Sequence, residues 1–191
     1  TLLVGAGLLI QSFRRVLQVD PGFDAQNLLT MQVSVNNPDG QQVANFFEQL
    51  QEKVRNLPGV ESVAVSNGLP FGVANFPPFI IEGRPDQENK PSGLRYTVSP
   101  DYFQTLGIEL LKGRVFTSQD TREGQRVVVI NEALARQYFP DEDPIGKTLK
   151  VGGLPMRVIG VDSVPLAVLV TPNLEEASIL AGFPVHDVTS M

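Results

Sequence analysis

The side chains from which most catalytic and metal sites are built are scarce in this chain. Its 191 residues include one histidine, His186, and no cysteine. Thiol catalysis, thiolate zinc sites and disulfide frameworks are therefore excluded within these residues. A Ser-His-Asp triad or a histidine metal site would depend on His186 alone, and neither a Gly-x-Ser-x-Gly nor a His-Glu-x-x-His motif occurs. We expect His186 to be an ordinary surface residue, and we expect no metal site and no cofactor.

The stretch Gly146-Lys147-Thr148 matches the end of a phosphate-binding loop. The complete pattern requires a glycine at residue 141, where this chain has Asp141, and a helix directly after the threonine. The residues that follow here alternate as a strand does. We therefore expect a turn that leads into a strand rather than a nucleotide site.

The same turn begins as a calcium-binding loop does, with Asp141 and Asp143. Such a loop also requires oxygen ligands at its fifth and twelfth positions, the last of them a bidentate glutamate. This chain has Ile145 and Gly152 at those positions. An EF-hand is therefore excluded, and we expect the acids of this turn to be solvated.

Four acidic residues, Asp101, Glu109, Asp120 and Glu132, are the remaining candidates for acid–base chemistry. Hydrolysis by paired carboxylates requires two of them in one cleft. All four lie at expected helix starts or polar turns, where a solvated or capping role is the ordinary one. A hydrolase remains an alternative, and alanine substitution of Asp101, Asp120 and Glu132 would then abolish its activity.

The charge balance is acidic, with 15 Lys and Arg against 21 Asp and Glu and a net charge of −6. Nucleic-acid binding requires clustered basic residues that neutralise phosphates. Two isolated basic–aromatic pairs, Arg95 with Tyr96 and Arg114 with Phe116, do not form such a cluster. Hydrophobic residues make up 42% of the chain and charged residues 19%, as in a globular protein. No nucleic-acid partner is expected.

The first third of the chain is expected to fold as a strand, a helix and a strand. Residues 28–36 alternate between apolar and polar side chains, and residues 60–67 do so again. Within residues 41–57 the apolar side chains recur every three or four positions, as on one face of an amphipathic helix. We expect this face to cover the sheet of its own domain, with docking of a partner helix as the alternative.

The rest of the core alternates short strands with short helices. A helix over residues 99–107 is expected to begin with Ser99 as its N-cap and to end at Gly107, and Asn131 is expected to cap a second helix over residues 131–139. Short strands mixed with short helices predict an α+β fold built on a mixed sheet. The expected strands cover residues 79–84, 94–99, 125–131, 147–151 and 156–161.

The run from Leu2 to Ile10 carries no polar side chain, and Arg14 and Arg15 follow it. As a helix it spans about 14 Å, less than half of a ~30 Å hydrocarbon core. No small-x-small cleavage site follows the run, which argues against a signal peptide. Taken alone, the run would be a buried helix or a signal core, and in a membrane helix the two arginines would oppose the usual charge bias.

Two stretches resemble the extracytoplasmic core domain of MacB-type and FtsX-like ABC-transporter permeases. They are VSPDYFQTLGIELLKGRVFTSQD (98–120) and VVVINEALARQYFPDEDPIGKTLKVGG (127–153), the second followed by RVIGV. The upstream VDPGFDAQNLLTMQVSV (19–35) and FFEQLQEKVRNLPGVESVAVSNGLPF (46–71) match the same family in order and spacing. The resemblance covers about residues 1–161.

The resemblance implies a division of the chain into three parts. Residues 1–18 would be the C-terminal part of a first transmembrane helix, and residues 19–161 an incomplete MacB-like extracytoplasmic core domain of mixed α+β fold. Residues 162–191 do not match the family's continuation. We expect them to be an atypical tail, truncated or out of frame, although they contain two apolar runs at 164–170 and 179–181.

The function implied by the resemblance is non-catalytic, with no catalytic, cofactor-binding or metal-ligating residue. The domain would couple a separate cytoplasmic ATPase subunit to events outside the membrane, by export or by transmitting movement. Other implied partners are the membrane, through the segment from Leu2 to Ile10, and other permease segments or a second copy of the chain. The implied location is the bacterial inner membrane, with the main domain in the periplasm. A soluble periplasmic binding module remains the alternative.

Overall fold

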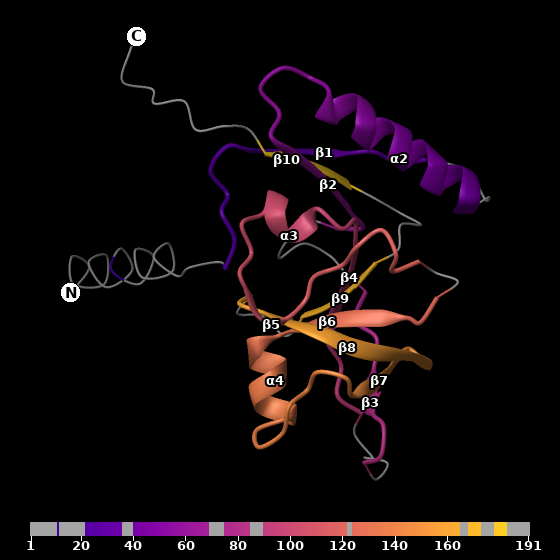
Figure 1. Ribbon diagram of the computed structural model, residues 1–191, viewed down its shortest axis with the longest axis vertical. Coiled ribbons are helices and arrows are strands. Elements are labelled where there is room, and N and C mark those ends of the chain that lie inside the picture. The colour runs from indigo at the N-terminus through magenta and orange to yellow at the C-terminus, as the bar shows by residue number, and fades with distance from the viewer. Residues whose placement is uncertain are drawn as a thin grey trace, which may run out of the picture.

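Figure 1 shows the computed structural model of the chain, which describes residues 11, 22–35, 40–68, 75–84, 90–121, 124–164, 168–172 and 178–182. Two subjects of the sequence-based expectations lie outside these residues. One is His186, and the other is the expected membrane segment at 1–18, apart from Gln11, which is helical and exposed. Within the described ranges, no helix combines the length and the apolar character that a membrane crossing needs.

The described strands form one ten-stranded mixed sheet. Its order is β1 (Leu28–Gln32), β10 (Ser178–Gly182), β2 (Ser62–Ser66), β4 (Leu94–Val98), β9 (Val168–Pro172), β6 (Val127–Asn131), β8 (Leu154–Asp162), β7 (Thr148–Val151) and β3 (Phe79–Ile81), and β5 (Leu110–Gly113) pairs with β8 off this path. The pairs β4–β9 and β6–β8 are parallel, and the remaining pairs are antiparallel. The expected α+β class with a mixed sheet is confirmed.

Three described helices pack on this sheet at different places (Figure 1). α2 (Gly40–Arg55) lies over the end formed by β1, β10 and β2, α3 (Tyr102–Thr105) contacts β2 and β10, and α4 (Glu132–Tyr138) contacts β6 and β8. The apolar face of α2 buries Val43 and Phe47 against Val63 and Val65 of β2. That face therefore covers the sheet of its own domain, as the apolar spacing predicts.

The strand β6 shows how the two faces of the sheet are filled. Its residues Val127 and Val129 belong to a core cluster that includes Phe103 of α3, while Val128 and Ile130 belong to a second cluster with α4. All five residues of β6 are buried. A strand buried on both faces reads as a continuous apolar run, which is why VVVIN shows no alternation.

Two strands of the sheet come from the segment expected to be an atypical tail. β9 lies between β4 and β6, and β10 lies between β1 and β2. The two apolar runs in the tail sequence overlap these strands, which join neighbours from earlier in the chain. The sheet therefore continues beyond residue 161.

The short helix α3 begins later than the sequence predicts, and Ser99 is not its cap. The N-cap is Asp101, which makes no capping hydrogen bond through its side chain. The Ser99 hydroxyl instead accepts a hydrogen bond from the Val65 amide at 3.0 Å, while its own amide donates to the Val65 carbonyl at 2.8 Å. The backbones of β2 and β4 pair at one position only, Ser66 with Val98. The Ser99 hydroxyl therefore takes the place of a backbone carbonyl as the acceptor for the Val65 amide.

Candidate functional site

Asp101, the first of the four acidic candidates, connects α2 to α3. Its Oδ2 atom pairs with the guanidinium of Arg55 and accepts a longer hydrogen bond, 3.4 Å, from the side-chain amide of Gln51. Gln51 also donates to the Val63 carbonyl of β2 at 2.8 Å. Because Gln51 and Arg55 are one helical turn apart, both reach the same carboxylate. Asp101 thus links α2 to the start of α3.

Asp120 is held by Arg114 in a bidentate pair, with distances of 2.7 and 2.8 Å. It also accepts hydrogen bonds from the amide and the hydroxyl of Thr117, at 2.8 and 3.2 Å. The hydrogen bond from Arg114 is the main reason why the pKa of Asp120 lies below its ordinary value. Because Asp120 is kept ionised and both of its oxygens accept hydrogen bonds from the loop, it is suited to fixing the conformation of that loop rather than to donating a proton.

The other two acids do not complete a catalytic pair. Glu132 forms an ion pair of 2.7 Å with Arg136 on α4, and the Glu109 backbone carbonyl accepts a hydrogen bond from the Ser163 amide at 3.0 Å. Among the described residues, no hydrogen bond or ion pair joins two of the four acids, and no group of three or more acidic or histidine side chains could hold a metal ion. A hollow beside β3 contains none of the four, being lined by Phe79, Ile80, Ile81, Arg84, Lys90, Pro91 and Tyr138.

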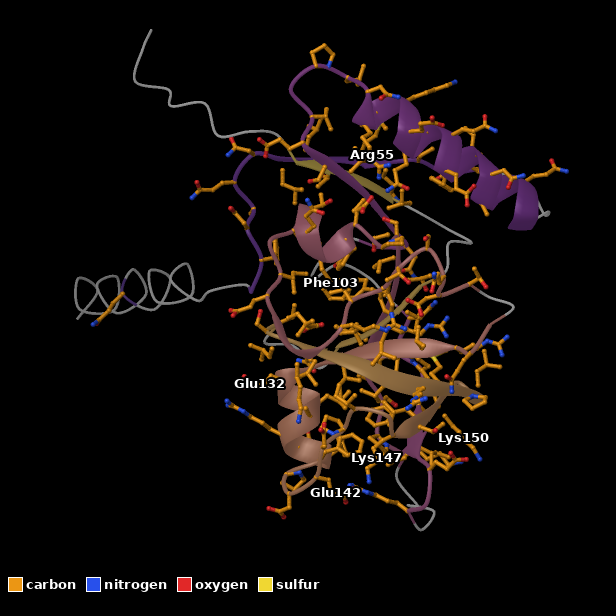
Figure 2. All side chains as sticks on the ribbon, in the orientation of Figure 1. Arg55, Phe103, Glu132, Glu142, Lys147 and Lys150 are labelled. Carbon is orange, nitrogen blue, oxygen red and sulfur yellow. The ribbon has the colours of Figure 1, made fainter. Side chains whose placement is uncertain are left out.

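Two acids of the turn before β7, Glu142 and Asp143, form ion pairs with lysines. Asp143 Oδ1 accepts from the Ile145 amide at 3.0 Å, and Asp143 also pairs with Lys112 at 2.8 Å. Glu142 pairs with Lys147 at 2.7 Å, at the end of the molecule where Figure 2 labels both. The hydrogen bond from Lys147 lowers the pKa of Glu142, and that from Lys112 lowers the pKa of Asp143. The expected turn into a strand is present, and its charges neutralise one another.

A buried polar pair lies where two parallel strands end side by side. Asn131 of β6 and Asp162 of β8 are register partners, and both have no exposed surface. Asn131 caps α4 as the sequence predicts, accepting a hydrogen bond from the Leu134 amide at 3.1 Å. Its side-chain amide donates to the Val164 carbonyl at 2.7 Å, and Asp162 accepts from the Val164 amide at 3.0 Å. The pair therefore fixes the chain where it leaves β8.

Asp162 is the most strongly perturbed acid among the described residues. Its second oxygen, Oδ2, is buried without a hydrogen-bond partner. Burial raises the pKa of Asp162 to about 7, and only the hydrogen bond from Val164 opposes this rise. Sequence reasoning missed this residue. The signal available was an aspartate closing the apolar strand RVIGV, in the same way that Asn131 closes VVVI.

The chain matches the family model of the MacB-like periplasmic core domain over residues 1–180. It is 38% identical over 66 residues to the uncharacterized ABC transporter permease YvrN of Bacillus subtilis (strain 168), a match that covers 35% of this chain and 16% of that protein. It is 41% identical over 66 residues to the macrolide export ATP-binding/permease protein MacB of Neisseria gonorrhoeae, covering 35% of this chain and 10% of that protein. The chain thus matches only a small part of these relatives' length.

Two solved structures share the fold. The periplasmic region of MacB from Actinobacillus actinomycetemcomitans aligns with a TM-score of 0.62 at 22% identity, covering 92% of this chain and 82% of that one. The extracellular domain of the noncanonic ABC-type transporter YknZ from Gram-positive bacteria aligns with a TM-score of 0.58 at 20% identity, covering 83% of this chain and 86% of that one. Together with the match over residues 1–180, these likenesses show that the chain belongs to the family of MacB-like periplasmic core domains.

Proposed function

We propose that this chain is the extracytoplasmic part of a bacterial inner-membrane ABC-transporter permease. In this proposal it catalyses no reaction and couples a separate cytoplasmic ATPase subunit to events outside the membrane, by export or by transmitting movement. The observation that carries the proposal is the family match over residues 1–180. The contacts of the acidic residues support it, because Asp101, Asp120 and Glu132 are engaged in ion pairs that fix elements of the fold.

The proposal also assigns a part to each end of the chain. Residues 1–18 would be the end of a first membrane helix, and residues 19–161 the core domain. The strands β9 and β10 support an extension of that domain into residues 162–191, since they pair within the same sheet. The remaining partners would be other permease segments or a second copy of the chain.

Labelling from outside the cell tests the location and the anchoring together. Since the chain has no cysteine, a single Lys150→Cys substitution on β7 creates a unique site in it at an exposed position. Figure 2 shows Lys150 at the end of the molecule away from α2. In the complete permease with its other cysteines removed, we expect a membrane-impermeant maleimide to label this site in intact spheroplasts. Labelling only after lysis would contradict the proposal, and release by osmotic shock would favour the soluble binding module.

Coupling to the ATPase needs a second measurement. We expect the complete permease in lipid nanodiscs to bind its ATPase subunit and to alter the rate of ATP hydrolysis. A hydrolase screen on the same preparation addresses the enzymatic alternative. An activity that disappears in the Asp101→Ala, Asp120→Ala or Glu132→Ala variants, while each variant keeps its thermal unfolding transition, would overturn the non-catalytic assignment.

A further inference from the structure

The chain enters the domain along α3. Figure 1 shows the entry segment, residues 22–28, running beside α3 toward β1. The Asp24 amide donates a hydrogen bond of 2.7 Å to the carbonyl of Leu106, the residue directly after α3. Phe23 and Leu28 pack against the core cluster to which Phe103 and Leu106 belong. The entry segment is therefore both bonded to the C-terminal end of α3 and packed against its core.

Gly107 allows this close approach. Its φ is +62°, in the left-handed region, and a Cβ at this position would lie 3.3 Å from the Cβ of Asp24. A side chain at residue 107 would thus press against the entry segment in addition to straining the backbone. Gly83 offers a matched comparison, because its φ is +83° and a Cβ there would meet nothing within 4 Å.

The other end of α3 is tied to α2. Asp101, the N-cap of α3, pairs with Arg55 and accepts a hydrogen bond from Gln51. Between these two ends Tyr102, Phe103 and Thr105 of α3 are buried, and so is Leu106 directly after it. Figure 2 places Phe103 in the middle of the molecule, where its cluster also draws residues from β2, β4, β6 and β8.

We propose that α3 is the element through which movement of the entry segment reaches the rest of the domain. In this proposal a displacement of Phe23 and Asp24 moves the C-terminal end of α3, which these residues contact. The N-terminal end of α3 then moves α2 through the ion pair between Asp101 and Arg55. Because three of the four residues of α3 are buried in a close-packed core, we expect α3 to shift as a unit. This inference rests on the proposed coupling function and names the part of the domain that performs it.

Hydrogen exchange of the complete permease with its ATPase subunit, with and without ATP, tests the inference. In the unaltered protein ATP should change exchange together in residues 22–28, 101–108 and 51–57. In the Gly107→Ala variant the Asp24 amide should exchange about tenfold faster, as expected for one lost hydrogen bond. The ATP-dependent change should then persist in residues 22–28 and disappear from the other two segments. Gly83→Ala should behave as the unaltered protein does.

Two further variants separate this outcome from simple misfolding. Phe23→Ala loosens the entry segment without touching Gly107 and should have the same effect. Arg55→Ala should abolish the response only in residues 51–57. If residues 101–108 and 51–57 still respond in both the Gly107→Ala and Phe23→Ala variants, α3 is not the route and the inference is wrong. If ATP changes exchange nowhere in the chain, the coupling function itself fails and the inference falls with it.

Discussion

Replacing Asp162 with asparagine should make the domain more stable, and the gain should depend on pH. Asp162 has no exposed surface, and its Oδ2 has no hydrogen-bond partner, so its charged form is poorly accommodated. Asparagine keeps an oxygen that can accept the hydrogen bond from Val164 and carries no charge. The buried site therefore loses its electrostatic cost while its one described hydrogen bond remains available.

The direction of the pH dependence follows from where the proton is bound. Burial raises the pKa of Asp162 from 3.8 to about 7 in the folded protein. Between these pH values the folded state holds a proton that the unfolded state releases, so the free energy of unfolding falls as the pH rises from about 4 to 7. A change of this size corresponds to at most about 4 kcal/mol, since each pH unit is worth 1.36 kcal/mol. The stability lost by the wild type should be retained by Asp162→Asn.

Urea denaturation at several pH values between 4 and 8 measures this difference. At pH 8 we expect Asp162→Asn to exceed the wild type in free energy of unfolding by about 2–4 kcal/mol, and the gain should shrink toward zero near pH 4. Asp141→Asn, which removes an exposed acid from the turn after α4, serves as the control and should change little. A difference between Asp162→Asn and wild type that stays constant across this range would refute the reasoning. So would a variant less stable than the wild type at pH 8.

Three other substitutions test contacts of the fold. Gly113→Ala would place a Cβ 2.2 Å from a backbone carbonyl oxygen of β8 at φ +79°, so it should cost about 3 kcal/mol or more in guanidinium unfolding. Asn131→Ala removes the cap of α4 and a buried hydrogen bond, and should lower the free energy of unfolding by about 2 kcal/mol. Arg114→Ala should raise the pKa of Asp120 toward its ordinary value, as NMR titration can follow. It should change stability at pH 7 by less than about 1 kcal/mol, because the Arg114 side chain is half exposed and Thr117 still donates two hydrogen bonds to Asp120.

Local sequence patterns predicted those elements whose structure depends on their own residues. The helix α2 follows from the spacing of its apolar side chains, and the cap at Asn131 from the residue type that best accepts the free amides of a helix start. Ser99 has the same capping chemistry, yet its hydroxyl serves β2 instead. The role of the Ser99 hydroxyl depends on where the backbone pairing between β2 and β4 stops. That limit is set by both strands together, so the sequence of either strand alone does not predict it.

The same limit explains the missed strands and the missed acid. The strands β9 and β10 lie between partners distant in sequence, so nothing near them indicates where they belong. In the sequence, Asp162 is only a polar residue at the end of a strand. Its burial beside Asn131 follows from the parallel pairing of β6 with β8, which the sequence does not show. Among the acidic candidates, Asp120 finds a partner nearby in the sequence, Thr117, as residues in turns usually do, whereas Asp101 pairs with the distant Arg55.

The order of the sheet has a mechanical consequence. β10 separates β1 from β2, and β9 separates β4 from β6, so strands from the last part of the chain hold the first strands in place. The unit that carries α2 is therefore incomplete without residues 178–182, even though α2 and its two flanking strands are contiguous in sequence. A force that the entry segment applies to β1 is therefore also carried by β10, the strand between β1 and β2. Truncation before residue 178 should consequently expose the β1 and β2 edges and raise hydrogen exchange in both strands, while β6 and β8, paired independently of β10, should stay protected.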